Sequence, residues 1–580
     1  MFFLNLNLNF IKYIFFLQIL YCNILFSNDL DYRANPEIGF NNGKKSIIAY
    51  SNNFMVVSAD KRASKAAESV LLKGGNALDA AIAAQNVLSV VEPQSSGLGG
   101  GGFLMYYDKK SNVLEAWDGR EFAPSSSHPN QYMFSINKKM SFLEALVNPI
   151  SIGVPGLYSM LADAHLENGR AKWKNLFKDA LIYADSFKVS PRLNKMLKWA
   201  SHVEKDIYAK EIYFDNNYPK DIGSTVRNFK LLNSLKILSE DSYSINKGEI
   251  SKLIDKDLSP ILTKKDLSSW KTIKRKPVCK NYKDYKICGF PPPTSGGVGV
   301  LQILGILENI ETNFDPYNTV LDEHLFLEAT RLAYADREVF IADPKFFEIP
   351  LQELLSEKYL KKRSKLIKEK EATKIINHGN PNDLKKSSLS IGVNLELPST
   401  THLSIVDKNG NAVSLTSSIE FAFGSGKTVG GFFLNNQLTD FSFAENDKNE
   451  NLIANSVAPK KKPRSSMSPT LVFKDDSLVG VFGSPGGSRI ICYVAKTLYY
   501  LINFNMKLEE VMELPHLCSR GPKTEIEAIE IADTKVKSLR AMGHDVIRKQ
   551  MTSGLNVIWK EKNQWTGLAD QRREGEAIGY

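Results

Sequence analysis

A short run around residue 400 combines hydroxyl side chains with the alternating pattern of a strand. Thr400 opens the stretch Thr-Thr-His-Leu-Ser-Ile-Val, directly after Ser399, and a second alternating stretch, 411–419, follows a turn that contains Gly410. A type I turn followed by a glycine in the left-handed conformation gives a three-residue hairpin loop. In that register Thr400 faces Ser418. Opposed residues place their Cβ atoms about 5 Å apart, so the two hydroxyls can hydrogen-bond.

A threonine hydroxyl is a weak nucleophile and needs a base. The sequence holds no convincing Ser-His-Asp set. His402 shares a strand face with Thr400 but would project beside the hydroxyl rather than towards it, so we interpret it as structural. If the chain is cut before Thr400, the freed α-amine, with a pKa of roughly 7.7–8.0, supplies the base. Ser399 and Thr401 are rival nucleophiles by position.

Further polar residues are of types that could bind the charged groups of a ligand. A guanidinium can hold a carboxylate through two hydrogen bonds, hydroxyls can support it, and acids can attract an ammonium. Each residue also has an ordinary interpretation, such as a surface ion pair, a turn or a helix cap, and only convergence on one site decides between them. The candidates are Arg120, Glu420, Gln437, Asp440, Ser465 and Ser466.

Two glycine runs stand out. The run 99–102 allows very close approach of the backbone to a neighbour. No Gly-Lys-Ser/Thr follows it and it leads into a predicted strand, which argues against a phosphate-binding loop. Gly486-Gly487 precedes an apolar helix predicted over 490–502. Adjacent glycine N–H groups can point at one developing oxyanion, although a plain loop before the helix is the alternative.

Together these motifs resemble the gamma-glutamyltranspeptidases, a family of N-terminal nucleophile hydrolases, along nearly the whole chain after its apolar start. The resemblance also rests on the Asp-Gly-Arg-Glu run at 118–121 and the Pro-Pro-Pro-Thr-Ser-Gly-Gly run at 291–297. It implies that the precursor cuts itself between Ser399 and Thr400. The lysine-rich run 358–388 lies upstream, and we expect its later part to be exposed and mobile.

The resemblance also implies roles for individual residues. Thr400 would be the nucleophile, with Ser418 as the second hydroxyl of the pair. The oxyanion would meet Gly486 and Gly487. The donor's α-carboxylate would meet Arg120, Ser465 and Ser466, and its α-ammonium would meet Gln437 and Asp440.

Two features depart from the family pattern. Glu420 stands where well-studied members have an asparagine near the substrate ammonium. We expect Glu420 on the second strand, facing the same way as Ser418. Residues 442–462 correspond to the family's active-site lid, but they are polar, hold no tyrosine and are somewhat short. Because a lid excludes water, the balance of hydrolysis and transfer stays open.

The implied fold is α+β, a four-layer αββα sandwich built jointly by a large segment, 28–399, and a small one, 400–580, which form a heterodimer. The implied activity is gamma-glutamyl transfer and hydrolysis on glutathione-like donors, with water, an amino acid or a peptide as acceptor. No cofactor, metal or nucleic acid is expected. The alternatives are a related acylase for beta-lactam side chains of the glutaryl or cephalosporin type, and an uncleaved protein that only binds gamma-glutamyl compounds.

The remaining sequence features bear on location and cross-links. Residues 1–27 have the charged start, apolar middle and small end residue of a signal peptide, which predicts export to the periplasm; an uncleaved membrane anchor is the alternative. The net charge of +10 is spread along the 580 residues, which favours a solvated basic surface. Of five cysteines, Cys279 and Cys288 would face each other across a two-residue turn, and their disulfide is left open.

Overall fold

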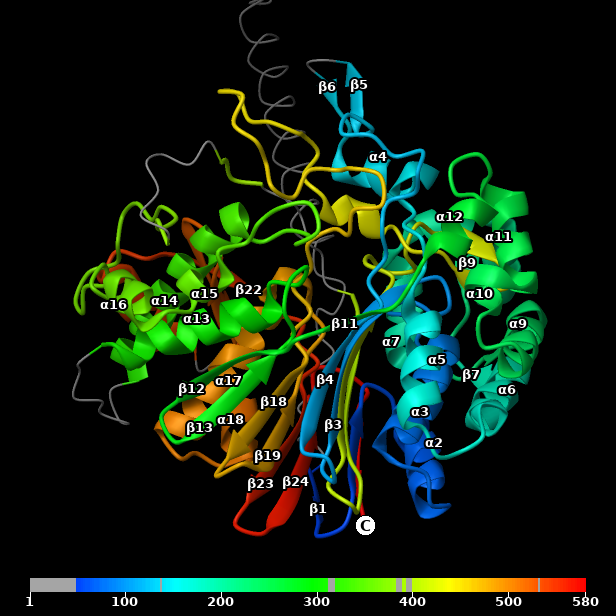
Figure 1. The fold of residues 1–580 in the computed structure, drawn as a ribbon, viewed down its shortest axis with the longest axis horizontal. Coiled ribbons are helices and arrows are strands. Elements are labelled where there is room, and N and C mark those ends of the chain that lie inside the picture. The colour runs from blue at the N-terminus through cyan, green and yellow to red at the C-terminus, as the bar shows by residue number, and fades with distance from the viewer. Residues whose placement is uncertain (1–47, 136–137, 311–318, 382–388, 393–398, 530–531) are drawn as a thin grey trace, which may run out of the picture.

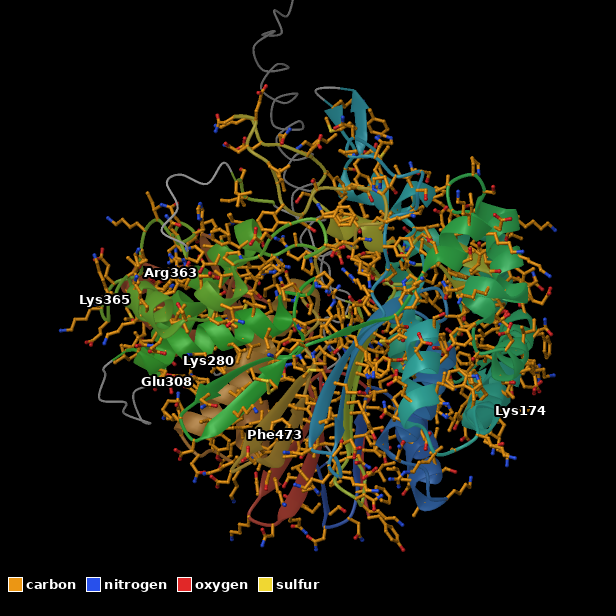
Figure 2. All side chains as sticks on the ribbon, viewed as in Figure 1. Lys174, Lys280, Glu308, Arg363, Lys365 and Phe473 are labelled. Atoms are coloured by element: carbon orange, nitrogen blue, oxygen red, sulfur yellow. A yellow bond between two sulfur atoms is a disulfide. The ribbon has the colours of Figure 1, made fainter. Side chains whose placement is uncertain are left out.

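The computed structural model describes residues 48–580 apart from 136–137, 311–318, 382–388, 393–398 and 530–531. The predicted signal peptide, 1–27, lies outside the described residues. Within the described ranges, no helix has the length and apolar character needed to cross a bilayer. The lysines Lys174 and Lys365 lie on opposite flanks of the molecule and point into solvent (Figure 2), which fits a dispersed basic surface.

Two seven-stranded antiparallel sheets stack face to face at the centre of the molecule (Figure 1). In spatial order, the first sheet consists of β1 (Ile48–Ser51), β24 (Gln564–Ala569), β23 (Asn556–Glu561), β19 (Ser477–Phe482), β18 (Thr470–Lys474), β13 (Tyr285–Gly289) and β12 (Val278–Tyr282). The second consists of β11 (Ile273–Arg275), β4 (Val113–Asp118), β3 (Gly101–Asp108), β15 (Ala412–Ser418), β14 (Thr401–Val406), β2 (Met55–Ser58) and β25 (Glu576–Gly579).

Helices cover the outer face of each sheet, which completes the four layers expected from the sequence (Figure 1). The side of the first sheet holds α13 (Gly296–Glu308), α14 (Thr319–Phe340), α15 (Leu351–Leu354), α16 (Glu357–Ser364), α17 (Ile490–Asn503), α18 (Leu508–Glu513) and α19 (Ala532–Ala541). The side of the second sheet holds α2 (Lys61–Leu72), α3 (Ala77–Val91), α5 (Leu157–Asn168), α6 (Lys178–Asp185), α7 (Pro191–Trp199) and α9 (Phe229–Glu240).

Shorter elements lie at the periphery. The helices among them are α4 (Phe142–Leu146), α8 (Ile207–Tyr213), α10 (Ser244–Lys247), α11 (Glu249–Leu258) and α12 (Lys264–Ser269). The paired short strands are β5 (Met133–Ser135) with β6 (Lys138–Lys139), β7 (Phe187–Lys188) with β10 (Thr225–Val226), β8 (Phe214–Asp215) with β9 (Tyr218–Pro219), and β16 (Thr428–Val429) with β17 (Phe432–Phe433). A three-stranded sheet consists of β20 (Leu517–Ser519), β21 (Lys523–Glu527) and β22 (Asp545–Lys549).

The central strands are buried on both faces, and their alternating side chains serve two different cores. On β3, Phe103 and Met105 join the core that contains Val481 and Ile558 of the first sheet. Leu104, between them, joins the core formed with α2 and α3 on the other side. Successive side chains of a strand point to opposite faces, so an apolar run can fill both cores at once.

The chain on both sides of residue 400 builds both sheets, as the resemblance implies. In the second sheet the hairpin β14–β15 is inserted between β2 and β3, and the last strand, β25, pairs with β2. In the first sheet β1 pairs with β24, and β13 pairs with β18. The two segments are therefore interleaved within a single pair of sheets.

Part of the lysine-rich run before Thr400 is hydrogen-bonded to α14, and its expected mobility stays a prediction. The backbone N–H of Thr373 donates to Glu328 Oε2 at 3.0 Å, and that of Gly379 donates to Asp336 Oδ1 at 2.8 Å. Both acceptors are buried carboxylates on α14. They take up backbone donors of the run. Residues 382–388 lie outside the described residues.

Two disulfides cross-link the side of the first sheet. Cys279 and Cys288 are directly opposed on β12 and β13 and are bonded to each other. Cys492 on α17 is bonded to Cys518 on β20, a pair that no local pattern in the sequence indicated.

Candidate active site

The hairpin that carries the predicted nucleophile has the predicted register. β14 pairs with β15 so that Thr401 is opposite Ser417, and Asp407 N–H donates to Asn411 O at 2.9 Å across the turn. The turn contains a glycine at φ 84°, as a three-residue loop requires. Thr400, one residue before β14, therefore lies opposite Ser418, and their hydroxyl oxygens are 2.9 Å apart.

Ser418 is held by the glycine run that the sequence singled out. A Cβ added at Gly100 would lie 2.2 Å from the carbonyl oxygen of Ser418, so only glycine allows this contact between neighbouring segments. The run therefore serves backbone packing beside the hydroxyl pair.

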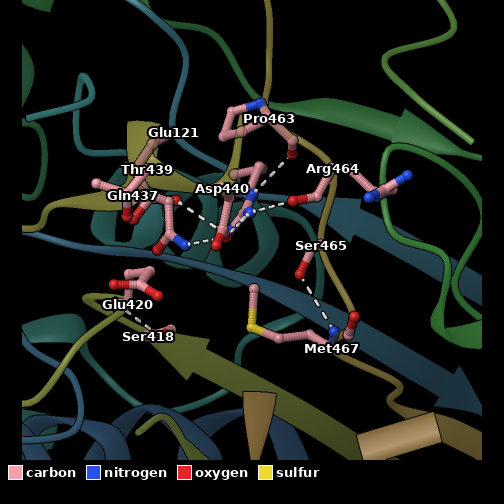
Figure 3. Close-up of polar contacts among 12 residues, drawn as sticks. Glu121, Ser418, Glu420, Gln437, Thr439, Asp440, Pro463, Arg464, Ser465 and Met467 are labelled. Atoms are coloured by element: carbon pink, nitrogen blue, oxygen red, sulfur yellow. Dashed lines mark hydrogen bonds and ion pairs between the residues drawn. The ribbon is translucent and has the colours of Figure 1, made fainter. Parts of the chain in front are cut away.

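One pocket brings nearly all of the predicted residues together (Figure 3). In Figure 3, Ser418 and Glu420 lie on one side of the site, and Gln437 and Asp440 lie across from them. The pocket holds about 270 Å³ of space, part of it open to solvent. It is lined by Arg120, Thr400, Ser418, Glu420, Gln437, Asp440, Ser465, Ser466, Met467, Gly487 and Ile490.

Arg120 and Asp440 form an ion pair in this pocket. Arg120 follows the end of β4, and Asp440 ends the 3-10 helix η4 (Gln437–Asp440). Arg120 Nη2 lies 2.6 Å from Asp440 Oδ2, which also accepts from Gln437 Nε2 at 2.6 Å. The guanidinium further donates to the carbonyl oxygens of Pro463 and Arg464. These contacts fix the plane of the guanidinium at the wall of the pocket.

A second carboxyl group lies beside this ion pair. Glu121 Oε2 is 3.8 Å from Arg120 Nη1, and the Glu121 side chain is fully buried. Burial raises the pKa of Glu121 to about 8, because desolvation outweighs the attraction of Arg120. At neutral pH this group is therefore mostly protonated, and it is Asp440 that hydrogen-bonds the Arg120 guanidinium.

The two predicted serines are supported by Arg337 and Ser295, which were not among the predicted site residues. Arg337 on α14 donates from Nη2 to Ser466 Oγ at 2.7 Å and from Nε to Ser295 Oγ at 2.8 Å. Ser295 in turn donates to the carbonyl oxygen of Ser465 at 2.7 Å. Met467 N–H donates to Ser465 Oγ at 3.1 Å. The Pro-Thr-Ser-Gly-Gly run thus holds the backbone of the serines in place through Ser295.

Glu420 lines the pocket, but the reason predicted for this is wrong. Strand β15 ends at Ser418, and Glu420 has a φ of 75°, so it belongs to a turn beyond the strand. Its backbone N–H donates to Ser418 Oγ at 2.9 Å, and Asn436 Nδ2 donates to its Oε2 at 2.5 Å. The turn and Asn436, rather than strand alternation, direct the carboxylate.

The predicted oxyanion glycines lie at the start of a buried helix. Gly487 begins the 3-10 turn η5 (Gly487–Arg489), which leads directly into α17. Gly487 lines the pocket, and Gly486 precedes it with a φ of 135°. The amino end of a helix favours negative charge. The role of Gly486 and Gly487 as hydrogen-bond donors to the oxyanion stays a prediction.

His402 is placed as a structural residue. It is fully buried, and its ring nitrogens contact Thr416 Oγ1 at 2.8 Å and Ser404 Oγ at 3.0 Å. Burial lowers the pKa of His402 to about 3, so the ring is neutral at working pH. Both ring nitrogens are thus engaged with hydroxyls other than that of Thr400.

The segment 442–462 starts and ends at the site. Asn455 Nδ2 donates to the carbonyl oxygen of Asp440 at 2.7 Å, and its Oδ1 accepts from Arg464 N–H at 2.9 Å. Its outer part turns at Asp447, which accepts from the N–H groups of Asn449 and Asn451. Asn455 thereby ties the segment to Asp440, which lines the pocket, and to Arg464, which directly precedes Ser465.

Comparison with known proteins agrees with this geometry. A family model for gamma-glutamyltranspeptidase matches residues 63–580. The glutathione hydrolase proenzyme of Bacillus subtilis (strain 168) is 33% identical over 542 residues, covering 90% of this chain and 91% of that protein. The glutathione hydrolase proenzyme of Escherichia coli (strain K12) is 32% identical over 534 residues, covering 89% and 90%.

A crystal structure of cephalosporin acylase from Bacillus halodurans has the same fold, with a TM-score of 0.81 at 23% sequence identity, covering 93% of this chain and 97% of that one. The family model spans most of the chain, and the two hydrolase proenzymes align with about nine tenths of it. The chain therefore belongs to the gamma-glutamyltranspeptidase family.

Proposed function

We propose that this chain is a proenzyme that cleaves itself between Ser399 and Thr400, and that the mature enzyme hydrolyses or transfers the gamma-glutamyl group of glutathione-like compounds. The observation that carries this proposal is the shared pocket: the hydroxyl pair Thr400–Ser418 lies beside the ion pair Arg120–Asp440. One pair suits acyl transfer and the other suits the two charged ends of an α-amino acid.

Maturation uses the hydroxyl of Thr400 within the intact chain. Its Oγ1 attacks the carbonyl carbon of Ser399, the C–N bond between the two residues breaks, and an ester forms on Thr400. Water then hydrolyses the ester, leaving a carboxylate on Ser399 and both a free amine and a free hydroxyl on Thr400. Segments 28–399 and 400–580 stay together as a heterodimer because strands of one segment pair with strands of the other in both sheets.

The mature reaction repeats this chemistry on a donor. The α-amine of Thr400 takes the proton as Oγ1 attacks the gamma-carbonyl carbon, and Ser418 Oγ, 2.9 Å away, accepts or donates a hydrogen bond to the reacting oxygen. The oxyanion is stabilised by the N–H groups of Gly486 and Gly487. The protonated amine returns its proton to the leaving amine, and water or an amine acceptor then releases the gamma-glutamyl group from Thr400.

Donor binding divides the pocket by charge. The α-carboxylate is bound by Arg120 with Ser465 and Ser466, and the α-ammonium by Asp440, Gln437 and Glu420. A donor with both charges exchanges the existing ion pair for two new ones, so no buried charge is left unpaired. This requirement favours gamma-glutamyl compounds over the acylase alternative, whose glutaryl substrates lack the ammonium.

Purification and sequencing test the processing step. We expect two fragments from wild-type protein, the smaller beginning Thr-Thr-His, and a single intact chain from Thr400→Ala. Cleavage at another bond would refute the assignment of Thr400. A wild-type protein that stays intact yet binds gamma-glutamyl compounds would favour the non-catalytic alternative.

A donor panel on the matured enzyme tests the substrate class. We expect release of glutamate from glutathione and gamma-glutamyl anilides and much slower release of glutarate from glutaryl anilides. Equal turnover of both classes would favour the acylase alternative.

The apolar segment 1–27 supports a further proposal, that the chain is exported to the periplasm. Cell fractionation with sequencing of the large fragment tests it: a start beyond residue 27 is expected in the periplasmic fraction. A membrane-bound fragment that begins at Met1 would favour the anchor alternative.

A further inference from the structure

The backbone at Thr400 has a conformation that a β-branched residue rarely adopts. Its φ is 89°, in the region where the side chain and the preceding carbonyl crowd each other. Such a conformation persists only when the surrounding structure holds it. Thr400 is 95% buried, so its surroundings can do so.

Three hydrogen bonds hold the chain at successive residues around Thr400. Ser399 Oγ donates to the carbonyl oxygen of Gln94 at 2.6 Å, and Thr401 Oγ1 donates to Glu92 Oε2 at 2.9 Å. Between them, the carbonyl oxygen of Thr400 itself accepts from Arg573 Nη1 at 2.9 Å. The chain is therefore fixed at Ser399, on one side of the bond that is to be cut, and at Thr400 and Thr401 on the other side.

Arg573 belongs to the segment between β24 and β25 and is 4% exposed. Its guanidinium is charged at any working pH, so its bond to the Thr400 carbonyl is a charge-assisted one. Its neighbour Arg572 is engaged elsewhere, with Glu527 and Asp570. Arg573 is thus the arginine of this pair that reaches the nucleophile.

We propose that Arg573 is a positioning residue with two successive tasks: it holds Thr400 for self-cleavage, and in the mature enzyme its charge keeps the new α-amine of Thr400 deprotonated near neutral pH. The proposal rests on the proposed cleavage at Ser399–Thr400 and assigns a role to a residue outside the substrate-binding set.

The first task follows from the backbone geometry. By holding the Thr400 carbonyl, Arg573 prevents the residue from relaxing to a negative φ. The crowding at positive φ involves the Ser399 carbonyl, and it ends when the acyl group moves from nitrogen to oxygen. Relief of this crowding favours the ester, so a residue that maintains the conformation speeds maturation.

The second task follows from the position of the charge. The amine nitrogen and carbonyl oxygen of one residue lie about 3 to 3.5 Å apart, so the guanidinium lies within about 6 Å of the new amine. A like charge at this distance lowers the amine's pKa. The charged groups near the new amine, besides Arg573, are Glu92, Asp60, Glu574, Glu420 and the pair Arg120–Asp440. Glu92 is paired with Arg192 and is also attracted by Arg573. These acids act in the opposite direction to Arg573 and are the same in every variant.

The test compares purified Arg573→Gln, Arg573→Lys and wild-type precursor. Maturation is followed as the appearance of the fragment that starts at Thr400. Arg540→Gln is the matched control, because Arg540 Nη2 also donates to a backbone carbonyl, that of Val546, at 3.0 Å, but on α19. Thermal unfolding is recorded for every variant, and maturation of Arg573→Gln is repeated with added methylguanidinium, which can replace the lost group.

We expect Arg573→Gln to mature about tenfold more slowly or worse, since a charged hydrogen bond is lost, with partial rescue by methylguanidinium. In the matured fraction, the acidic limb of the pH profile of kcat/KM should move up by about half to one pH unit. Arg573→Lys should mature slowly but keep the wild-type limb, because its charge remains. Arg540→Gln should match wild type in both measurements.

Wild-type maturation rate and an unmoved limb in Arg573→Gln would overturn the proposal. If Arg573→Gln loses its cooperative unfolding transition, Arg573→Lys decides: slow maturation supports the proposal and a wild-type rate refutes it. Failure of wild-type protein to be cut before Thr400 would instead refute the proposed function, and this inference with it.

Discussion

Arg120 and Asp440 form a buried ion pair, with Nη2 and Oδ2 2.6 Å apart. The family resemblance assigns these residues to opposite ends of the donor, and the structure joins them directly. A zwitterionic donor can replace this pair with two pairs of its own. A donor with only a carboxylate would separate Arg120 from Asp440 and leave a buried carboxylate without a cation, which is costly.

Arg120→Lys should weaken donor binding strongly. A lysine keeps the charge but loses the planar fork that reaches Asp440 and the carbonyls of Pro463 and Arg464. Loss of a charged hydrogen bond is worth about 1.5–3 kcal/mol, or roughly ten- to a hundredfold in KM for glutathione. Steady-state kinetics on fully matured protein would measure this. An unchanged KM would remove Arg120 from the carboxylate site.

Glu420→Gln tests whether the acidic side of the pocket detects the donor's ammonium. Glutamine can still accept the hydrogen bond that Asn436 Nδ2 donates to Glu420 Oε2, so the local geometry is kept while the charge is removed. We expect kcat/KM for gamma-glutamyl anilide to fall about three- to tenfold, with little change for glutaryl anilide. Equal losses for both donors would mean that Glu420 supports the fold of the site and does not pair with the amine.

Arg337→Gln should raise the donor KM about tenfold with a smaller effect on kcat, because its bonds to Ser466 and Ser295 orient the serines that we propose bind the carboxylate, and not the nucleophile. Arg331→Gln is the matched control on the same helix, since Arg331 pairs with Glu328 within α14. A fall confined to kcat would contradict the positioning of Ser466.

The buried histidines predict loss of stability in acid. The pKa of His402 is about 3 in the folded protein, against 6.5 for an ordinary solvated histidine, because burial disfavours the charged ring. Between these values the unfolded chain binds the extra proton, so the free energy of unfolding falls as pH drops below 6.5, by up to about 1.4 kcal/mol per pH unit for this one group. The contribution of the neutral His402 ring to stability is fully present above pH 6.5.

Urea unfolding of the uncleaved Thr400→Ala precursor at pH 7, 6 and 5 measures this slope, because this form can refold as a single chain. His202, His516 and His544 have pKa values lowered to about 4, 3 and 4, so they add to it. His402→Gln should lower the slope of the free energy of unfolding against pH by the contribution of one proton. This holds whatever the stability of the variant at pH 7. A slope as steep as that of wild type would show that His402 is protonated in the folded state.

Local pattern predicted those parts of the site that depend on neighbours in the chain. The turn length set the register that places Thr400 opposite Ser418, and a two-residue turn placed Cys279 opposite Cys288. Glu420 was misplaced on a strand because no sequence pattern indicates that β15 ends at Ser418.

Contacts between distant segments could not be predicted in this way. Arg573 bonds to Thr400 across 173 positions, and Arg337 bonds to Ser466 across 129. Cys492 and Cys518 are separated by 26 residues with an entire helix between them. Such pairs are set by how the layers stack, because the helices and sheet ends that carry these residues meet only in the folded chain.

The pairing of strands from the two segments within both sheets has a consequence for reversibility. The precursor can unfold and refold as one molecule, because β2, β14 and β15 belong to a continuous chain. After cleavage at Thr400 the same sheets would have to be rebuilt from two molecules, so renaturation would become second order in protein concentration. Folding would thus be reversible before self-cleavage and not after it. The mature protein would fold once, as the precursor, and would then persist because it unfolds slowly.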